Sequence, residues 1–165
     1  MGEIDKIYET KVKYSGIFDF KNIYTLIFEW LSDMGYFVVE KEYSEKIKAE
    51  GKEIEIKWIC TKKVTDYFRF IINVNWRIDN LQEIEITKEK KIRTNKGNIE
   101  IKFSAILERD WQNKYEVSPF HKFLRAVYEK YIIPNRIEQM EEKVTEEVLD
   151  IVNNIKAYLI LEGKK

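Results

Sequence analysis

The sequence contains one cysteine and one histidine, and these scarcities exclude several kinds of chemistry. Cys60 has no second cysteine for an internal disulfide and falls in the apolar phase of its segment, so we expect a small buried residue rather than a reactive thiol. No motif places a serine or cysteine beside His121, which favours a surface or capping histidine over a catalytic one. A transition-metal site of ordinary ligand spacing is therefore excluded, and we expect no metal and no cofactor.

Phosphate-binding loops and long apolar runs are also missing. The six glycines are scattered, and none forms GxGxxG or GxxxxGK[ST]. No run approaches the roughly 18 apolar residues of a membrane span, and the charged N-terminal segment does not resemble a signal peptide. The formal net charge is zero, so any contact with nucleic acid or an anionic membrane has to be local. These features predict a cytoplasmic protein without a membrane span.

The composition predicts a single folded domain over residues 1–165. Apolar residues make up 44% of the chain and charged residues 35%, which is typical of a folded protein rather than a disordered one. We see no internal repeat and no low-complexity tract. The pattern divides into a strand, a helix and a strand meander over residues 1–110, followed by a helical segment over residues 118–162.

A long pattern of period two lies between residues 53 and 107. Its clearest part has six consecutive same-face positions that are all apolar: Phe68, Phe70, Ile72, Val74, Trp76 and Ile78. Side chains alternate across a strand, so this pattern predicts a sheet with one polar and one aromatic-rich apolar face. Together with strands near residues 8–14 and 36–49, turns at 50–51, 64–66, 79–80 and 95–97 predict about six antiparallel strands. In the second strand Lys41 and Glu45 interrupt the apolar phase, which indicates a bulge or a strand that leaves the core.

Two helical patterns can cover the apolar face of this sheet. Asp19 caps the first, which ends at Gly35. Ser118 followed by Pro119 starts the second, a capping serine before a proline at the first helical position. Pro134 interrupts it, so the C-terminal segment is either one long bent helix or a helical hairpin. We therefore expect an α+β fold with helices on one face of the sheet.

This order of elements is similar to the helix-grip fold of the START-like superfamily, which includes lipid-transfer domains, polyketide cyclases and plant ligand-binding proteins. The resemblance covers nearly the whole chain and rests on element order. It implies a sheet curled around a long C-terminal helix, with an apolar ligand in the gap between them. The family usually has two short helices and seven strands, and its terminal helix is normally uninterrupted.

The aromatic face of the sheet gives the leading functional hypothesis, a non-enzymatic module that binds an apolar or amphipathic small molecule. In this interpretation side chains of the sheet form the pocket walls and two tyrosines close it from the C-terminal helix. The alternative is that the same side chains form an ordinary close-packed core. The residues concerned are Trp58, Phe70, Trp76 and Phe103 in the sheet and Tyr128 and Tyr131 in the helix.

The second hypothesis is helix-mediated association, with the same chain or another protein. The stripe over residues 135–162 has nearly heptad spacing, as a coiled-coil face would: Ile137, Met140, Val144, Val148 and Ile151. On the same helix Glu138, Glu141, Glu142 and Glu146 share a face, which favours solvent or a basic partner over a magnesium site. An enzymatic activity stays open, but no residue set assigns catalytic roles.

A third hypothesis is a weak contact with nucleic acid or phosphate through the basic hairpin 88–96. Its cations are Lys88, Lys90, Lys91, Arg93 and Lys96. Each phosphate that such residues neutralise adds salt-dependent affinity. Lysines at hairpin tips and sheet edges also prevent aggregation, and the zero net charge disfavours a nucleic-acid partner.

Overall fold

The computed structural model describes residues 3–87, 91–115 and 118–163 of the chain. Its elements are β1 (Glu3–Phe18), α1 (Phe20–Asp33), β2 (Phe37–Lys48), β3 (Gly51–Lys63), β4 (Phe68–Thr87), β5 (Lys91–Arg109), α2 (Pro119–Val127), the π-helix η1 (Tyr128–Ile132) and α3 (Pro134–Gly163). The strands form one antiparallel sheet in the order β1-β5-β4-β3-β2. The predicted α+β class is confirmed, with five strands instead of about six.

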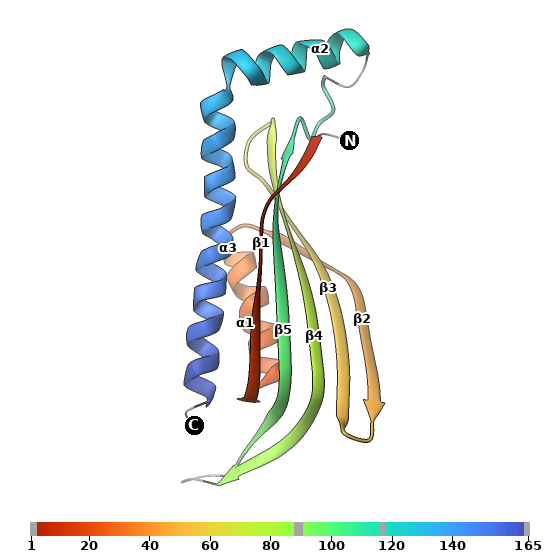
Figure 1. Cartoon of the computed structure of the whole chain (residues 1–165), viewed down its shortest axis with the longest axis vertical. Coiled ribbons are helices and arrows are strands. Elements are labelled where there is room, and N and C mark those ends of the chain that lie inside the picture. The colour runs from red at the N-terminus through yellow and green to blue at the C-terminus, as the bar shows by residue number, and fades with distance from the viewer. Residues whose placement is uncertain (1–2, 88–90, 116–117, 164–165) are drawn as a thin grey trace.

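Helices α1 and α3 lie on the same side of the sheet (Figure 1). α3 packs against β1 and β5, and α1 packs over β3 and β4, where Tyr24 meets Trp58 with ring centroids 5.1 Å apart. All six apolar positions from Phe68 to Ile78 are buried. The period-two pattern therefore identified the covered face correctly, because only side chains of one phase point toward the helices.

The predicted turn at 79–80 is wrong, and this explains the difference in strand number. β4 continues through it as a β-bulge: the register with β5 shifts between Asp79 and Gln82, and Asn80 has a φ of 55°. Gly97 on β5 accommodates the bulge, since a Cβ there would lie 3.0 Å from the Asp79 carbonyl oxygen. The predicted turn at 95–97 likewise lies inside β5. Asparagine and glycine suit a bulge as well as a turn, since both tolerate positive φ.

The interruption that Lys41 predicted in the second strand is confirmed. The register between β2 and β3 shifts between Glu40 and Glu42. Phe37 and Ile47 of β2 are exposed, with fractions of 71% and 82%, while Val38 and Val39 are half-buried. β2 is thus an edge strand that contributes little to the core.

The predicted helix boundaries agree with the structure. Asp19 accepts a hydrogen bond from the backbone N–H of Asn22 at 3.1 Å, and Gly35 ends the first helical segment with a φ of 95°. Ser118 caps α2. The C-terminal segment is broken at η1, just before Pro134, so that α2 lies across one end of the molecule, transverse to α3 (Figure 1).

Candidate functional site

The four aromatic residues predicted as pocket walls lie together in the core. Trp58, Phe70, Trp76 and Phe103 are each at most 2% exposed. The rings of Trp58 and Trp76 are 5.1 Å apart. The indole N–H of Trp58 already donates to Glu40 at 3.2 Å. None of the four lines any of the surface clefts described below, so the ligand hypothesis for this position stays a prediction.

The two tyrosines expected to close that pocket lie elsewhere. The ring of Tyr128 packs against Tyr67, 5.5 Å away, and Tyr115, 6.1 Å away, at the end of the sheet next to α2. Tyr131 is 70% exposed. The helix that covers the tryptophans is α1, through Tyr24 and Phe28, because residues 119–132 lie across the end of the sheet and not over its apolar face (Figure 1).

The apolar stripe of α3 belongs to the core. Val144, Val148 and Ile151 are buried, and α3 packs on β1 and β5. Ile137 and Met140 are partly buried against the same core. A partner helix could reach the three buried residues only if α3 left the sheet, and helix-mediated association stays a prediction.

The described cations of the basic segment lie on β5. Lys88 and Lys90 fall outside the described residues. Lys91, Arg93 and Lys96 are exposed on β5, and Nε of Arg93 is 3.6 Å from a carboxylate oxygen of Glu85 on the paired strand β4. A phosphate contact here stays a prediction.

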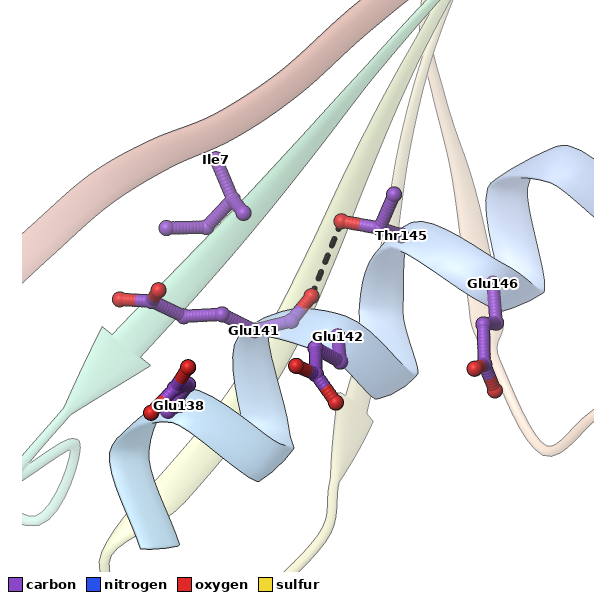
Figure 2. Close-up of a pocket in the computed structure, with 6 residues that line it drawn as sticks. All are labelled: Ile7, Glu138, Glu141, Glu142, Thr145 and Glu146. Atoms are coloured by element: carbon purple, nitrogen blue, oxygen red, sulfur yellow. Dashed lines mark hydrogen bonds between the residues drawn. The ribbon is translucent and has the colours of Figure 1, made fainter. Parts of the chain in front are cut away.

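An acidic hollow of about 390 Å³ lies beside the first half of α3 and next to Ile7 of β1. Figure 2 shows its four carboxylates spread along the helix, with Glu138 and Glu146 well separated. The Thr145 hydroxyl already has a hydrogen-bond partner within the helix, because it donates to the backbone oxygen of Glu141 at 2.9 Å. Across the described residues, no group of three or more acidic, histidine or cysteine side chains could hold a metal ion. The hollow suits solvent or a basic partner.

The candidate site is a cleft of about 360 Å³ at the other end of α3. Beyond its bulge the β4–β5 hairpin bends toward the C-terminal end of α3 (Figure 1). The cleft lies among this hairpin, the end of β1, the start of α1 and the last turns of α3. Its lining residues are Ile17, Asp19, Asn22, Ile86, Ile92, Arg93, Thr94 and Glu162.

Hydrogen bonds between distant elements fix the rim of the cleft. The backbone N–H of Phe20 donates to Oδ1 of Asn95 at 3.1 Å, which ties α1 to β5. The side-chain amide of Asn22 donates to the Tyr158 hydroxyl at 2.7 Å, which ties α1 to α3. Burial raises the pKa of Tyr158 to about 12, so its hydroxyl stays neutral near pH 7. The rim is therefore assembled from elements that are held together before any ligand arrives.

The interior of the cleft combines an apolar wall with one unusual polar group. Ile17, Ile86 and Ile92 supply the wall. Thr94 is 8% exposed, and its hydroxyl oxygen is buried without a hydrogen-bond partner among the described residues. An unsatisfied buried hydroxyl costs about 1–3 kcal/mol, and a bound molecule with a hydrogen-bonding group would remove that cost.

The sequence held a signal for Thr94 that the prediction missed. Ile86 pairs with Ile92 and Ile84 pairs with Thr94 across the hairpin, so Thr94 is the polar member of an otherwise apolar same-face group. The predicted turn at 95–97 hid this pairing. Because the segment 88–96 is rich in lysine and arginine, the sequence predicted a phosphate contact there and not an apolar cleft.

No family model, curated protein or solved structure matches this chain. In the described parts of the chain, no helix has the length and apolar character needed to cross a bilayer. The functional proposal therefore rests on the residues of the cleft.

Cys60 provides a prediction about pH. Burial raises the pKa of its thiol from 9.0 to about 12. The folded protein keeps this proton between those values while the unfolded chain loses it, so stability falls as pH rises above 9. Relative to Cys60→Ala, the wild-type free energy of unfolding should drop by about 1.4 kcal/mol between pH 7 and about pH 10. Urea denaturation of both proteins at the two pH values measures this. A pH-independent difference between them would contradict the assignment.

Proposed function

We propose that the protein is a non-enzymatic binding module that holds an amphipathic small molecule in the cleft at the C-terminal end of α3. The observation that carries the proposal is the buried Thr94 hydroxyl, which lacks a partner in the described structure and borders an apolar cleft. The cleft volume of about 360 Å³ falls within the range of small-molecule sites, roughly 300–1,000 Å³. The functional class is the one that the aromatic sheet suggested, at a different place in the fold.

The lining chemistry indicates what kind of ligand fits. The apolar body of the ligand would pack on Ile17, Ile86 and Ile92, and its polar head would reach Thr94. Three charged groups border the cleft: the carboxylates of Asp19 and Glu162 and the guanidinium of Arg93. Arg93 is largely exposed and close to Glu85, so the balance of charge favours an amine or hydroxyl head over a carboxylate.

The fold supports a site in this general position. In the helix-grip fold the ligand lies between the sheet and the C-terminal helix, and here the bent β4–β5 hairpin and α3 border the cleft. We therefore include the helix-grip likeness in the proposal, with the ligand at the end of α3 instead of beneath Trp58 and Phe103.

The test is a titration of the isoleucine-methyl-labelled protein, followed by NMR. Decylamine and decanoate have the same tail and opposite head charge. We expect saturable shifts for Ile17, Ile86 and Ile92 with decylamine, weaker shifts with decanoate, and unchanged methyls for Ile72 and Ile101, which are fully buried in the core. Absence of saturable shifts at the three cleft methyls with either probe would contradict the proposal.

Two variants and one control sharpen the result. Thr94→Val keeps the shape of the side chain and removes the hydroxyl, so binding should weaken about fivefold, the effect of one hydrogen bond. Ile92→Asp should weaken it at least about tenfold. Ile47→Asp is the matched control, since Ile47 is 82% exposed on the edge strand β2 and should leave the affinity unchanged. Equal affinity in all three would place the ligand elsewhere.

A further inference from the structure

The helices at the opposite end of the molecule have an unusual orientation. Residues of α2 and η1 lie across the end of the fold that is remote from the ligand cleft (Figure 1). The buried residue of α2 is a cation, Arg125, which is 6% exposed. Its guanidinium is 2.9 Å from Glu3 and 3.5 Å from Asp110. A surface helix normally turns its apolar stripe toward the core, and α2 turns a charged side chain inward instead.

The apolar side of α2 consequently faces solvent. Phe120 is 64% exposed, Phe123 61% and Leu124 38%. Their spacing of three and four residues places them on one face of the helix. The inward ion pairs of Arg125 fix the rotation of the helix about its axis. The exposure of Phe120, Phe123 and Leu124 therefore follows from contacts within the fold.

The π-helix extends the apolar face. η1 closes with a bond from the backbone N–H of Ile133 to the carbonyl of Tyr128 at 3.1 Å, a spacing of five residues that widens the turn. Each residue then advances around the axis by less than in an α-helix. This brings both Tyr131, 70% exposed, and Ile132, 66% exposed, toward the side that carries Phe123.

The exposed area is large for a protein of this size. The α2–η1 face consists of Phe120, Phe123, Leu124, Tyr131 and Ile132. Taking roughly 200 Å² for each side chain, about 600 Å² of apolar surface is accessible. The largest apolar patch on a typical monomer covers about 300–600 Å² and is often functional, so this face lies at the upper end of that range.

The charges around the face select the occupant. In the fully described stretch 119–136 the exposed charged side chains are Lys122, Lys130 and Arg136, all cations. Lys122 is the sequence neighbour of Phe123, and Nζ of Lys130 lies 5.4 Å from the centroid of the Tyr131 ring. The one acidic residue of the stretch, Glu129, points inward, where it binds Arg109 and Tyr67. A second copy of the face would bring like charges together, whereas an anionic surface would attract Lys122 and Lys130. The next exposed carboxylate after this stretch, Glu138, lies on α3.

We propose that the α2–η1 face docks the protein on an anionic membrane surface. The helix lies in the headgroup region, with Phe123, Tyr131 and Ile132 inserted and the ammonium groups of Lys122 and Lys130 on lipid phosphates. A protruding helix with an aromatic face and a cationic edge is the usual form of an interfacial anchor. The inference is independent of the proposed ligand cleft.

Sedimentation with lipid vesicles tests this docking. The full chain is mixed at low salt with vesicles of phosphatidylcholine alone or with an equal part of phosphatidylglycerol. We expect sedimentation with the anionic vesicles only, reduced by added salt because screening weakens the lysine contacts. Failure to bind anionic vesicles, or equal binding to both kinds, would overturn the proposal.

Matched variants test whether vesicle binding depends on the α2–η1 face or on exposed apolar side chains in general. Phe123→Ser with Ile132→Ser should weaken vesicle binding at least about tenfold, and Lys122→Glu with Lys130→Glu should do the same without removing apolar area. The control, Phe37→Ser with Ile47→Ser, removes two side chains of equal or greater exposure from β2 and should bind like the wild type. Equal loss in the control would overturn the assignment. So would a dimer, detected by analytical ultracentrifugation, that the Phe123 and Ile132 variant dissociates while vesicle binding is absent.

Discussion

Replacing Val148 with aspartate is expected to abolish cooperative folding of the whole chain. Val148 is fully buried where α3 packs on the sheet. A carboxylate at this position is desolvated without a partner, which costs several kcal/mol even after its pKa rises. The total stability of such a domain is roughly 5–15 kcal/mol. Circular dichroism should therefore show a molten or unfolded chain at room temperature.

The neighbouring residue gives the control for this substitution. Leu149 is 37% exposed on the outer side of α3, so Leu149→Asp should keep the cooperative transition and shift the melting temperature by only a few degrees. The comparison also decides between core and interface. A Val148→Asp protein that stayed folded and lost only self-association would show that the stripe of α3 belongs to an interface, as the sequence alone allowed.

Those parts of the fold that depend on local chemistry were predictable. The alternation from Phe68 to Ile78 identified the buried face of the sheet because strand geometry makes that pattern unambiguous. Asp19 and Ser118 marked two helix starts because each caps backbone N–H groups within a few residues. In each case the residues that decide the structure are close together in the sequence.

The strand count and the cleft depended on pairing between distant residues. The residues around Asn80 and Gly97 suit either a turn or a bulge, and only the register between β4 and β5 decides between them. The predicted turns at 79–80 and 95–97 did not allow Thr94 to be paired with Ile84. The cleft was therefore not predicted. The position of the cleft also requires the bend of the hairpin toward α3, which no local pattern encodes.

The orientation of α2 shows a further limit of periodicity. The spacing of Phe120, Phe123 and Leu124 places them on one face of the helix, but spacing alone does not say which face turns inward. Arg125 decides the orientation through Glu3 and Asp110, which come from the first strand and from the end of the sheet. An apolar stripe predicts burial only when the sheet offers apolar surface opposite it, and this end of the sheet offers carboxylates.

Replacing Arg109 with methionine should be the most damaging polar substitution, because this side chain joins three elements. It is 14% exposed and lies 2.8 Å from Glu3 and 2.7 Å from Asp5, and it also binds Glu129 of η1. Its loss leaves three carboxylates near one another without their shared cation. Removing one partner of a buried ion pair costs about 3–5 kcal/mol. We expect about 3 kcal/mol, because Glu3 and Asp5 are nearly half exposed.

Urea denaturation of three variants measures this cost. Arg93→Met is the control, since Arg93 forms an exposed pair with Glu85 and its loss should change stability by at most about 1 kcal/mol. Combining Arg109→Met with Glu129→Gln should recover part of the loss, because it removes the carboxylate that the arginine no longer neutralises. An Arg109→Met effect no larger than that of the control would show that solvent, and not Arg109, compensates these acids.

Hydrogen exchange should locate the damage. Glu129 connects η1 to the sheet through Arg109 and Tyr67, while the core beneath α1 has no member in this cluster. In Arg109→Met the backbone amides of α2 and η1 should therefore exchange faster than in the wild type, with those around Trp58 on β3 changed only by the global loss of stability. Uniform acceleration in both regions would mean that α2 and the sheet unfold as one unit. Selective acceleration would show that the Arg109 cluster stabilises α2 and η1 at the end of the sheet.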